Sequence, residues 1–188
     1  MFITKDNCKS LSDKEIISKS IEELDYFKCL YERYGNKLKR YITKISGFNA
    51  DEADDILQNS FISIWKNINS YDDSLKLSSF IYRIVHNETI SHWRKLKSKE
   101  KRNKQFGMNM YIEEDKNEDK IKRNFEVKEV LDKLSLKYKE VLVLKFLENM
   151  DYEEISNILK IPEGTVATRI NRAKKAFVKI ARSKNIKF

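Results

Sequence analysis

The chain contains very few of the residues from which tight turns are built. Its 188 residues include four Gly and a single Pro, Pro162, whereas Lys, Glu, Ile and Leu are abundant. A β-sandwich or β-barrel requires many tight turns, so this composition favours helices. We therefore expect an all-α protein. The length suits one medium domain or two small ones, and either can bury a hydrophobic core.

Apolar residues recur at helical spacing through the first half of the chain. A capping box at Ser12 and Glu15 is followed by apolar residues at this spacing up to Ile45, which predicts one long helix. Two more helices are predicted over 50–68 and 77–96, with a polar turn between them.

The second half shows the same spacing and predicts a four-helix domain over 123–188. Between the halves, residues 98–122 change from strongly basic to strongly acidic and hold few apolar side chains. Such a segment cannot bury enough apolar surface to fold alone, so we expect a flexible linker. The predicted organisation is a helical domain over 1–97, the linker, and the helical domain over 123–188.

Positive charge is concentrated at the C-terminal end of the chain. There are 38 Lys and Arg against 29 Asp and Glu, a formal net charge of +9, yet no Asp or Glu occurs from Gly164 onward. This distribution favours a polyanionic partner, most simply nucleic acid. The stripe of the last helix that we expect to be buried consists of Val166, Ile170, Ala173 and Phe177.

The last two predicted helices and the turn between them have the pattern of a helix-turn-helix. In this motif the second helix lies in the major groove, and its first turns reach the base edges. Those turns here carry Thr165, Thr168, Asn171 and Arg172, and the lysines further along are better placed for phosphates. An amphipathic helix with a merely solvated basic face is the alternative at this point.

Three segments resemble the extracytoplasmic-function (ECF) sigma factors, which direct bacterial RNA polymerase to promoters. Residues 53–68, ADDILQNSFISIWKNI, are similar to region 2.2 of that family. Residues 80–95, FIYRIVHNETISHWRK, are similar to regions 2.3 and 2.4. Residues 134–177, which include KIPEGTVATRINRAKKAF, are similar to region 4. The segments occur in the order of the family, and the resemblance covers roughly residues 25–97 and 125–180.

The resemblance implies a sigma factor that binds core RNA polymerase and promoter DNA, recognises the −10 and −35 elements, and assists promoter melting. An anti-sigma factor is a further implied partner. The implied −35-binding residues are Thr165, Thr168, Arg169, Asn171, Arg172, Lys175 and Lys179. The implied −10-binding residues, in or after the loop 69–79, are Tyr71, Phe80, Arg83, Asn87, Arg94 and Lys95. The implied polymerase-binding residues are Asp54, Asp55, Gln58, Asn59, Phe61 and Trp65.

The chain departs from the family pattern at three positions. Lys160 stands in the helix-turn-helix turn where glycine is frequent, and a left-handed conformation there would cost about 1 kcal/mol. Ala167 replaces a residue that is often basic, and Ser91 stands where Asp is frequent. These differences bear on the promoter sequence, not on the class of protein.

An enzyme is not expected from this sequence. His86 and His92 are the only histidines, and they lie about 240° apart around a helix, so they cannot share one metal ion. The chain has no HExxH, glycine-rich phosphate loop or GxSxG motif. We expect no catalytic residues, metal or cofactor. The main alternative is a helix-turn-helix regulator that acts without polymerase, and a helical adaptor that binds only proteins is a weaker one.

The cysteines and the apolar runs bear on where the protein works. Cys8 and Cys29 do not form a CxxC motif, and we expect both as reduced thiols. No apolar run approaches the roughly 18 residues of a membrane span. The expectation is a cytoplasmic protein without membrane insertion.

Overall fold

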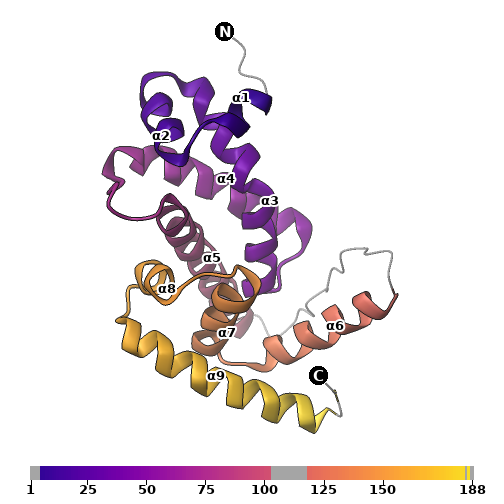
Figure 1. The fold of residues 1–188 in the computed structure, drawn as a ribbon. Coiled ribbons are helices and arrows are strands. Elements are labelled where there is room, and N and C mark those ends of the chain that lie inside the picture. Colours follow the sequence, from indigo (N-terminus) through magenta and orange to yellow (C-terminus); the bar gives the residue numbers. More distant parts are fainter. Residues whose placement is uncertain (1–4, 103–117, 185, 187–188) are drawn as a thin grey trace. The chain divides into compact units, whose positions relative to one another are not determined.

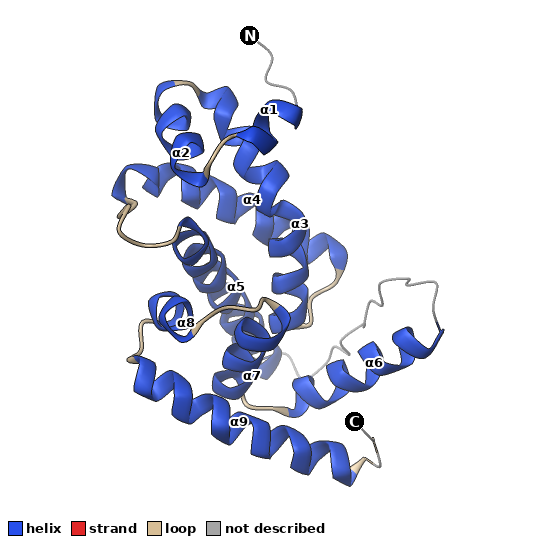
Figure 2. Cartoon of the chain, viewed as in Figure 1, coloured by secondary structure: helices blue, strands red, loops and turns tan. Residues whose placement is uncertain are grey.

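The structure, a computed structural model, describes residues 5–102, 118–184 and 186 (Figures 1 and 2). These residues form helices and no strand, which confirms the all-α prediction. The chain divides into two compact units, one formed by helices α1 to α5 and the other by α6 to α9. Residues 103–117 of the predicted linker lie outside the described residues. Its two ends are helical, since α5 continues to Arg102 and α6 begins at Glu118.

In the first unit, α3, α4 and α5 pack against one another and α1 and α2 pack on α3. The elements are α1 (Lys5–Ser10), α2 (Asp13–Glu22), the short 3-10 helix η1 (Leu24–Tyr26), α3 (Phe27–Ser46), α4 (Ala50–Asn67), the 3-10 helix η2 (Ile68–Ser70) and α5 (Leu77–Arg102).

The structure has two helices, α2 and α3, where the sequence predicts one long helix. The capping box is present at its start, because the Ser12 hydroxyl accepts from the Glu15 amide and the Glu15 carboxylate accepts from the Ser12 amide. However, the backbone at Glu23 is extended (φ −139°, ψ 114°) and ends α2. Ile21 and Leu24, on either side of this break, are 50% and 61% exposed instead of buried. The apolar spacing continues across the break and therefore conceals it.

A disulfide joins Cys8 of α1 to Cys29 of α3, with 5.0 Å between their Cα atoms. The expectation of two reduced thiols is therefore wrong. The two residues are 21 positions apart, and they meet because α1 packs against the first turns of α3. Sequence spacing alone does not reveal this contact.

In the second unit, α9 packs against α6, α7 and α8, which confirms the predicted four-helix domain. The elements are α6 (Glu118–Lys133), α7 (Leu136–Leu142), the π-helical turn η3 (Val143–Leu147), α8 (Tyr152–Leu159) and α9 (Glu163–Ser183). In η3 the Glu148 amide donates to the Val143 carbonyl at 3.0 Å, and Asn149 follows in the left-handed region (φ 56°).

The turn between α8 and α9 is formed by Lys160 in the left-handed conformation (φ 53°, ψ 49°). The Ser156 hydroxyl donates to the Ile161 carbonyl at 2.7 Å and so ties the turn back to α8. This is the conformation in which glycine is usually favoured. The Cβ of Lys160 therefore makes this left-handed conformation less favourable in energy than it would be for glycine.

His86 is a buried histidine in the core of the first unit, with 7% of its surface exposed. A hydrogen bond of 2.8 Å joins its Nδ1 to the Tyr41 hydroxyl. Burial, with a smaller contribution from the charge of Arg94, lowers the pKa of His86 from 6.5 to about 4.

The stability of the protein should therefore fall in mild acid. Below pH 6.5 the unfolded chain takes up a proton at position 86 that the folded chain does not take up until its pKa of about 4. We expect the free energy of unfolding to drop by about 2 kcal/mol between pH 7 and pH 5 from this residue. Urea unfolding at pH 7 and at pH 5 measures this drop in the free energy of unfolding. His86→Gln should remove this part of the pH dependence, and His92→Gln should retain it.

Replacing Lys160 with Gly should raise the free energy of unfolding by about 1 kcal/mol, because glycine has no Cβ to oppose the left-handed conformation. Urea unfolding is again the measurement. Lys160→Ala is the matched control: it removes the charge but keeps the Cβ, so it should give no gain. Equal gains in both variants would show that the charge and not the backbone conformation is responsible.

Candidate nucleic-acid interface

Helices α8 and α9 form the helix-turn-helix that the sequence predicts. Asp151 and Glu154 make a capping box at the start of α8, with the Glu154 amide donating to Asp151 at 2.8 Å. The first turn of α9 begins at Pro162, whose carbonyl accepts from the Thr165 amide at 2.8 Å. The N-terminus of α9 is open, since a side chain at Gly164 would meet nothing within 4 Å. A groove of DNA could therefore approach this end closely.

The rotation of α9 about its axis is fixed by apolar burial. Val166, Ile170 and Ala173 are at most 1% exposed, as predicted. Phe177, the fourth member of the predicted stripe, is only half-buried and lines a pocket instead. Of the predicted −35-binding residues, the exposed ones are Thr168, Asn171, Arg172, Lys175 and Lys179, and the half-buried ones are Thr165 and Arg169.

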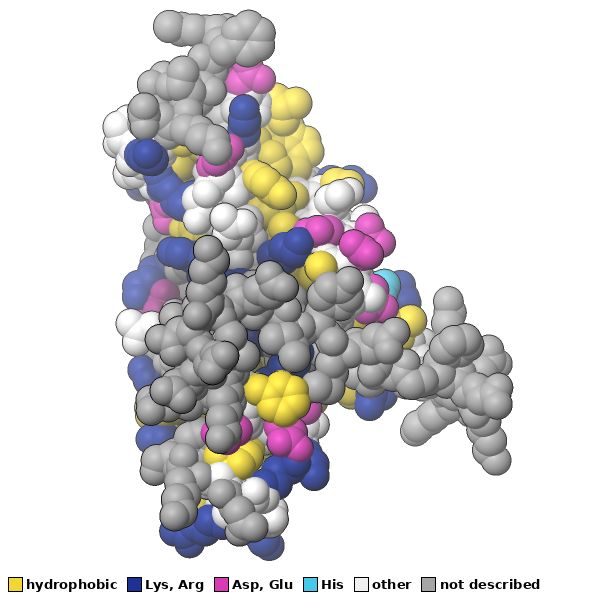
Figure 3. Space-filling model, turned by 90° about the vertical axis from the view of Figure 1, so that its right-hand side faces the viewer, with side chains coloured by type: hydrophobic (Ala, Val, Ile, Leu, Met, Phe, Trp, Pro, Cys, Tyr) yellow, Lys and Arg dark blue, Asp and Glu magenta, His cyan; other side chains and the backbone are white. Residues whose placement is uncertain are grey.

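The exposed face of α9 is cationic. Glu163 at its start is the last acidic residue of the whole sequence. In Figure 3, Lys and Arg side chains are visible at the lower end of the view and also at several places higher up. The exposed Thr168 hydroxyl donates to the Gly164 carbonyl at 2.8 Å, and its oxygen can still accept a hydrogen bond. The face thus combines cations with short polar side chains.

Residues 69–79, called here the −10 segment, run from the end of η2 to the first turn of α5. The Tyr71 hydroxyl donates to the Leu75 carbonyl at 2.6 Å, and the Ser74 amide donates to the Asp72 carboxylate at 3.0 Å. Hydrogen bonding from the Ser74 side chain, with a further contribution from this amide bond, lowers the pKa of Asp72. These local bonds give the segment a defined shape.

The two aromatic residues predicted for −10 binding lie together, but only one is accessible. The ring centroids of Tyr71 and Phe80 are 5.4 Å apart. Phe80 is 4% exposed, so its ring supports Tyr71 from the core side and offers no free stacking surface. The Arg83 guanidinium lies over the Phe80 ring at 5.8 Å from its centroid. Asn87, Arg94 and Lys95 follow along α5 and are exposed.

The residues predicted to bind polymerase lie on α4. Asp55, Gln58 and Asn59 are exposed, whereas Asp54 is half-buried and accepts a hydrogen bond of 2.7 Å from Lys39 of α3. Phe61 is buried, and Trp65 is 36% exposed.

Two aromatic residues of α3 join Phe61 and Trp65, and the sequence prediction missed their role. Phe27 lies 5.2 Å from Trp65 and 6.0 Å from Phe61, and Tyr31 lies 5.0 Å from Phe61, measured between ring centroids. We call these four residues the aromatic face. Tyr31 is half exposed, and the signal that could have revealed it is the i, i+4 spacing of two aromatic residues on one side of a helix.

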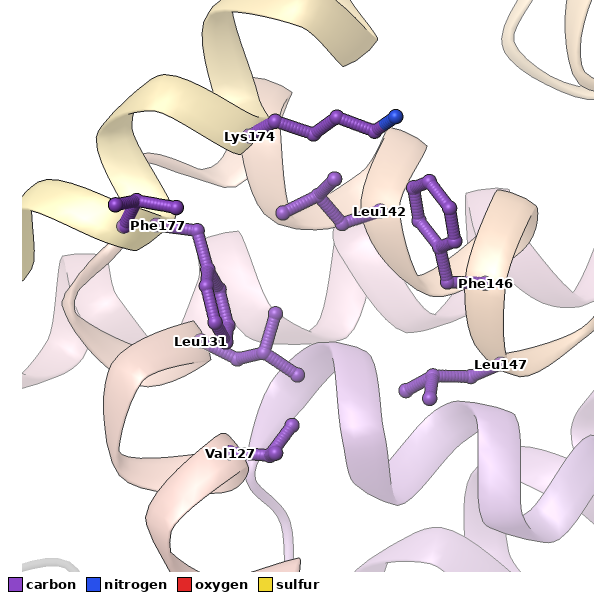
Figure 4. Close-up of a pocket in the computed structure, with 8 residues that line it drawn as sticks. Val127, Leu131, Leu142, Phe146, Leu147, Lys174 and Phe177 are labelled. Atoms are coloured by element: carbon purple, nitrogen blue, oxygen red, sulfur yellow. The ribbon is translucent and has the colours of Figure 1, made fainter. Parts of the chain in front are cut away.

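The second unit has an apolar pocket of about 340 Å³ (Figure 4). It lies among α6, α7, η3 and α9, and it is lined by Val127, Leu131, Leu142, Phe146, Leu147, Lys174, Phe177 and Val178. Phe146 is largely exposed, with the Lys174 ammonium 5.1 Å from its ring centroid. Large apolar side chains left partly open in this way are typical of a protein-binding groove.

Within the described parts of the chain, no three or more His, Cys, Asp or Glu side chains are grouped to hold a metal ion. None of the described helices has the length and apolar character needed to span a membrane.

Both units match known protein families in sequence. Residues 30–99 match the family model of sigma-70 region 2, and residues 124–177 match that of sigma-70, region 4. The ECF RNA polymerase sigma factor SigW of Bacillus subtilis (strain 168) is 34% identical over 166 residues, which cover 82% of this chain and 88% of that protein. The ECF RNA polymerase sigma factor EcfG of Rhodopseudomonas palustris (strain TIE-1) is 29% identical over 140 residues, 73% of this chain and 75% of that protein.

Solved structures share the fold. CnrH, in complex with the cytosolic domain of CnrY, matches with a TM-score of 0.68 and 19% identity over 91% of this chain and 97% of that one. The sigma factor RpoE, in complex with the anti-sigma factor NepR from Bartonella quintana, matches with a TM-score of 0.70 and 20% identity over 83% of this chain and 96% of that one. From both matched regions and the extent of the similarity to SigW, the chain belongs to the ECF sigma factors of the sigma-70 family.

Proposed function

We propose that this chain binds core RNA polymerase in the cytoplasm and directs it to promoters whose −35 element is read by α9 and whose −10 element is read by the −10 segment and α5. The observation that carries the proposal is the cationic, acid-free face of α9, exposed opposite its buried stripe. In this role the chain performs no covalent chemistry, and binding energy drives promoter recognition and assists melting.

At the −35 element, the first turns of α9 enter the major groove. Asn171 and Arg172 are exposed there, and these side chains pair well with adenine and guanine respectively. Lys175 and Lys179 lie further along the same helix and contact phosphates. Phosphate contacts fix the register, and the base contacts give the sequence preference.

At the −10 element, Tyr71 receives an unstacked base. Its ring is held from beneath by Phe80 and by the hydroxyl bond to Leu75, so little side-chain freedom is lost on binding. The exposed Arg94 and Lys95 and the half-exposed Arg83 then follow the phosphates of the single strand.

Core polymerase binds the aromatic face and the adjacent exposed residues of α4. Partly exposed aromatic side chains, together with the exposed carboxylate of Asp55 elsewhere on α4, suit a basic helical partner. The apolar pocket of the second unit is a second protein-binding surface. An anti-sigma factor would cover these surfaces, and an anti-sigma partner is known for a protein of similar fold, since RpoE was solved in complex with the anti-sigma factor NepR.

A helix-turn-helix regulator that acts without polymerase is the competing function. Fluorescence anisotropy with promoter DNA, with and without core enzyme, separates the two functions. A sigma factor should bind specifically only in the presence of core polymerase and should then set the start site in run-off transcription. Specific binding by the chain alone, unchanged by polymerase, would favour the regulator.

Replacing Arg172 with Ala should weaken holoenzyme binding to a matched −35 site by roughly 1 to 3 kcal/mol and relax the base preference there. Replacing Lys179 with Ala should weaken binding to all sequences alike and reduce the slope of log affinity against log salt by about 1. Salt titrations on matched and scrambled −35 DNA measure both effects. If the two variants behaved identically on both DNAs, Arg172 would not be a base-reading residue.

Replacing Tyr71 with Ala should weaken holoenzyme binding to DNA with a single-stranded −10 element by roughly 1 to 3 kcal/mol, because a stacking surface is lost. Tyr71→Phe keeps the ring and removes only the hydroxyl bond to Leu75, so it should retain most of the affinity. Anisotropy on fork-junction DNA is the measurement, with fully duplex DNA as its control. Equal losses for Ala and Phe would assign the effect to the hydroxyl and argue against stacking.

A further inference from the structure

The Cys8–Cys29 disulfide holds a very short helix in place. The six residues of α1 cannot form a stable helix alone, and their position depends on contacts with α3. Both cysteines are buried, Cys8 at 5% and Cys29 at 0% exposure. Breaking the S–S bond therefore removes the covalent restraint on α1.

Arg33 reinforces the position of α1 from one turn along α3, on the same helical face as Cys29. Its guanidinium donates to the Cys8 carbonyl at 2.8 Å and to the Leu11 carbonyl at 2.6 Å. It also donates to the carboxylate of Asp13, the first residue of α2. The Arg33 side chain is thus hydrogen-bonded to α1, to the connection between α1 and α2, and to the start of α2.

The start of α2 in turn contacts the −10 segment. The Lys14 ammonium donates to the Asp73 carboxylate at 2.7 Å. Asp13 also accepts a hydrogen bond of 2.7 Å from the hydroxyl of Tyr34 on α3. A continuous path of bonds therefore leads from the disulfide through Arg33 and α2 to Asp73 in the −10 segment.

We propose that Cys8 and Cys29 form a reversible thiol–disulfide switch that sets the position of the −10 segment through Arg33 and the start of α2. This inference rests on the −10 role proposed above. In the oxidised state the path is intact, and in the reduced state α1 is released and the support of the −10 segment weakens. Cytosolic disulfides are uncommon in most bacteria, and those that occur are usually transient and sense redox conditions.

The chemistry of the switch is thiol–disulfide exchange with a dithiol reductant. The S–S bond between Cys8 and Cys29 accepts two electrons and two protons and becomes two thiols, while the reductant forms its own disulfide. A disulfide oxidant such as oxidised glutathione carries out the reverse step. Because both sulfur atoms are buried, exchange proceeds when α1 opens from α3.

The aromatic face lies away from the disulfide. Phe27 and Tyr31 are two residues before and after Cys29, and each is therefore about 200° from it around α3. Reduction should leave the aromatic face, and hence the affinity for core polymerase, unchanged. Core binding is thus an internal control for folding.

The first measurement is the thiol state of the full-length chain. After equilibration in glutathione redox buffers, alkylation and mass spectrometry should show a disulfide that forms and is reduced reversibly in one two-electron step. The Cys8→Ala variant should form no intramolecular disulfide under the same conditions. Failure of the wild-type chain to form an intramolecular disulfide in oxidised glutathione would overturn the proposal.

The second measurement compares oxidised and reduced holoenzyme on fork-junction DNA with matched and altered −10 elements. Oxidation should increase discrimination for the matched element by roughly two- to fivefold, the size expected for one exposed ion pair such as Lys14–Asp73. Cys8→Ala should show the reduced behaviour in both buffers, and oxidised Lys14→Ala should lose the gain. Equal discrimination in both redox states overturns the switch, whereas absence of −10 binding in either state would count against the proposed function instead.

Discussion

Burial of one apolar stripe on α9 is the constraint on which the DNA-facing surface depends. With Val166, Ile170 and Ala173 in the core, α9 cannot rotate, and Arg172 and Lys175 must face outward. Because α8 begins at a capping box and the turn is tied by Ser156, the start of α9 is also fixed along its axis. Both the rotation and the position of α9 follow from packing within a small domain.

The two surfaces that we propose for recognition in the first unit are built in a similar way. On the aromatic face, buried Phe61 contacts exposed Tyr31, and in the −10 segment buried Phe80 contacts Tyr71. In each pair the inner ring limits the conformations of the outer one before any partner arrives. This arrangement lowers the entropic cost of binding and places the outer ring accurately. Under the proposed function, the buried Phe61 and Phe80 therefore contribute to recognition by positioning the outer rings.

Much of this architecture could be predicted from local sequence signals. The capping box at Ser12, the periodic stripe of α9 and the absence of acidic residues after Glu163 each depend on neighbours within a few positions. The features that escaped prediction depend on distant contacts or on backbone geometry. The extended backbone at Glu23 has no glycine or proline to mark it, and the pairing of Cys8 with Cys29 requires α1 to fold back on α3.

The π-helical turn η3 contributes to the apolar pocket of the second unit, whereas the exposed cationic residues lie on α9. Its wider turn accommodates one residue more than an α-helical turn, and it carries Phe146 and Leu147, which are 53% and 39% exposed and line the apolar pocket. Removing one residue there would rotate these side chains by about 100° and so change the lining of the pocket that they share with Lys174 of α9. A single-codon insertion or deletion can thus remodel this apolar surface without altering any residue on the cationic face of α9.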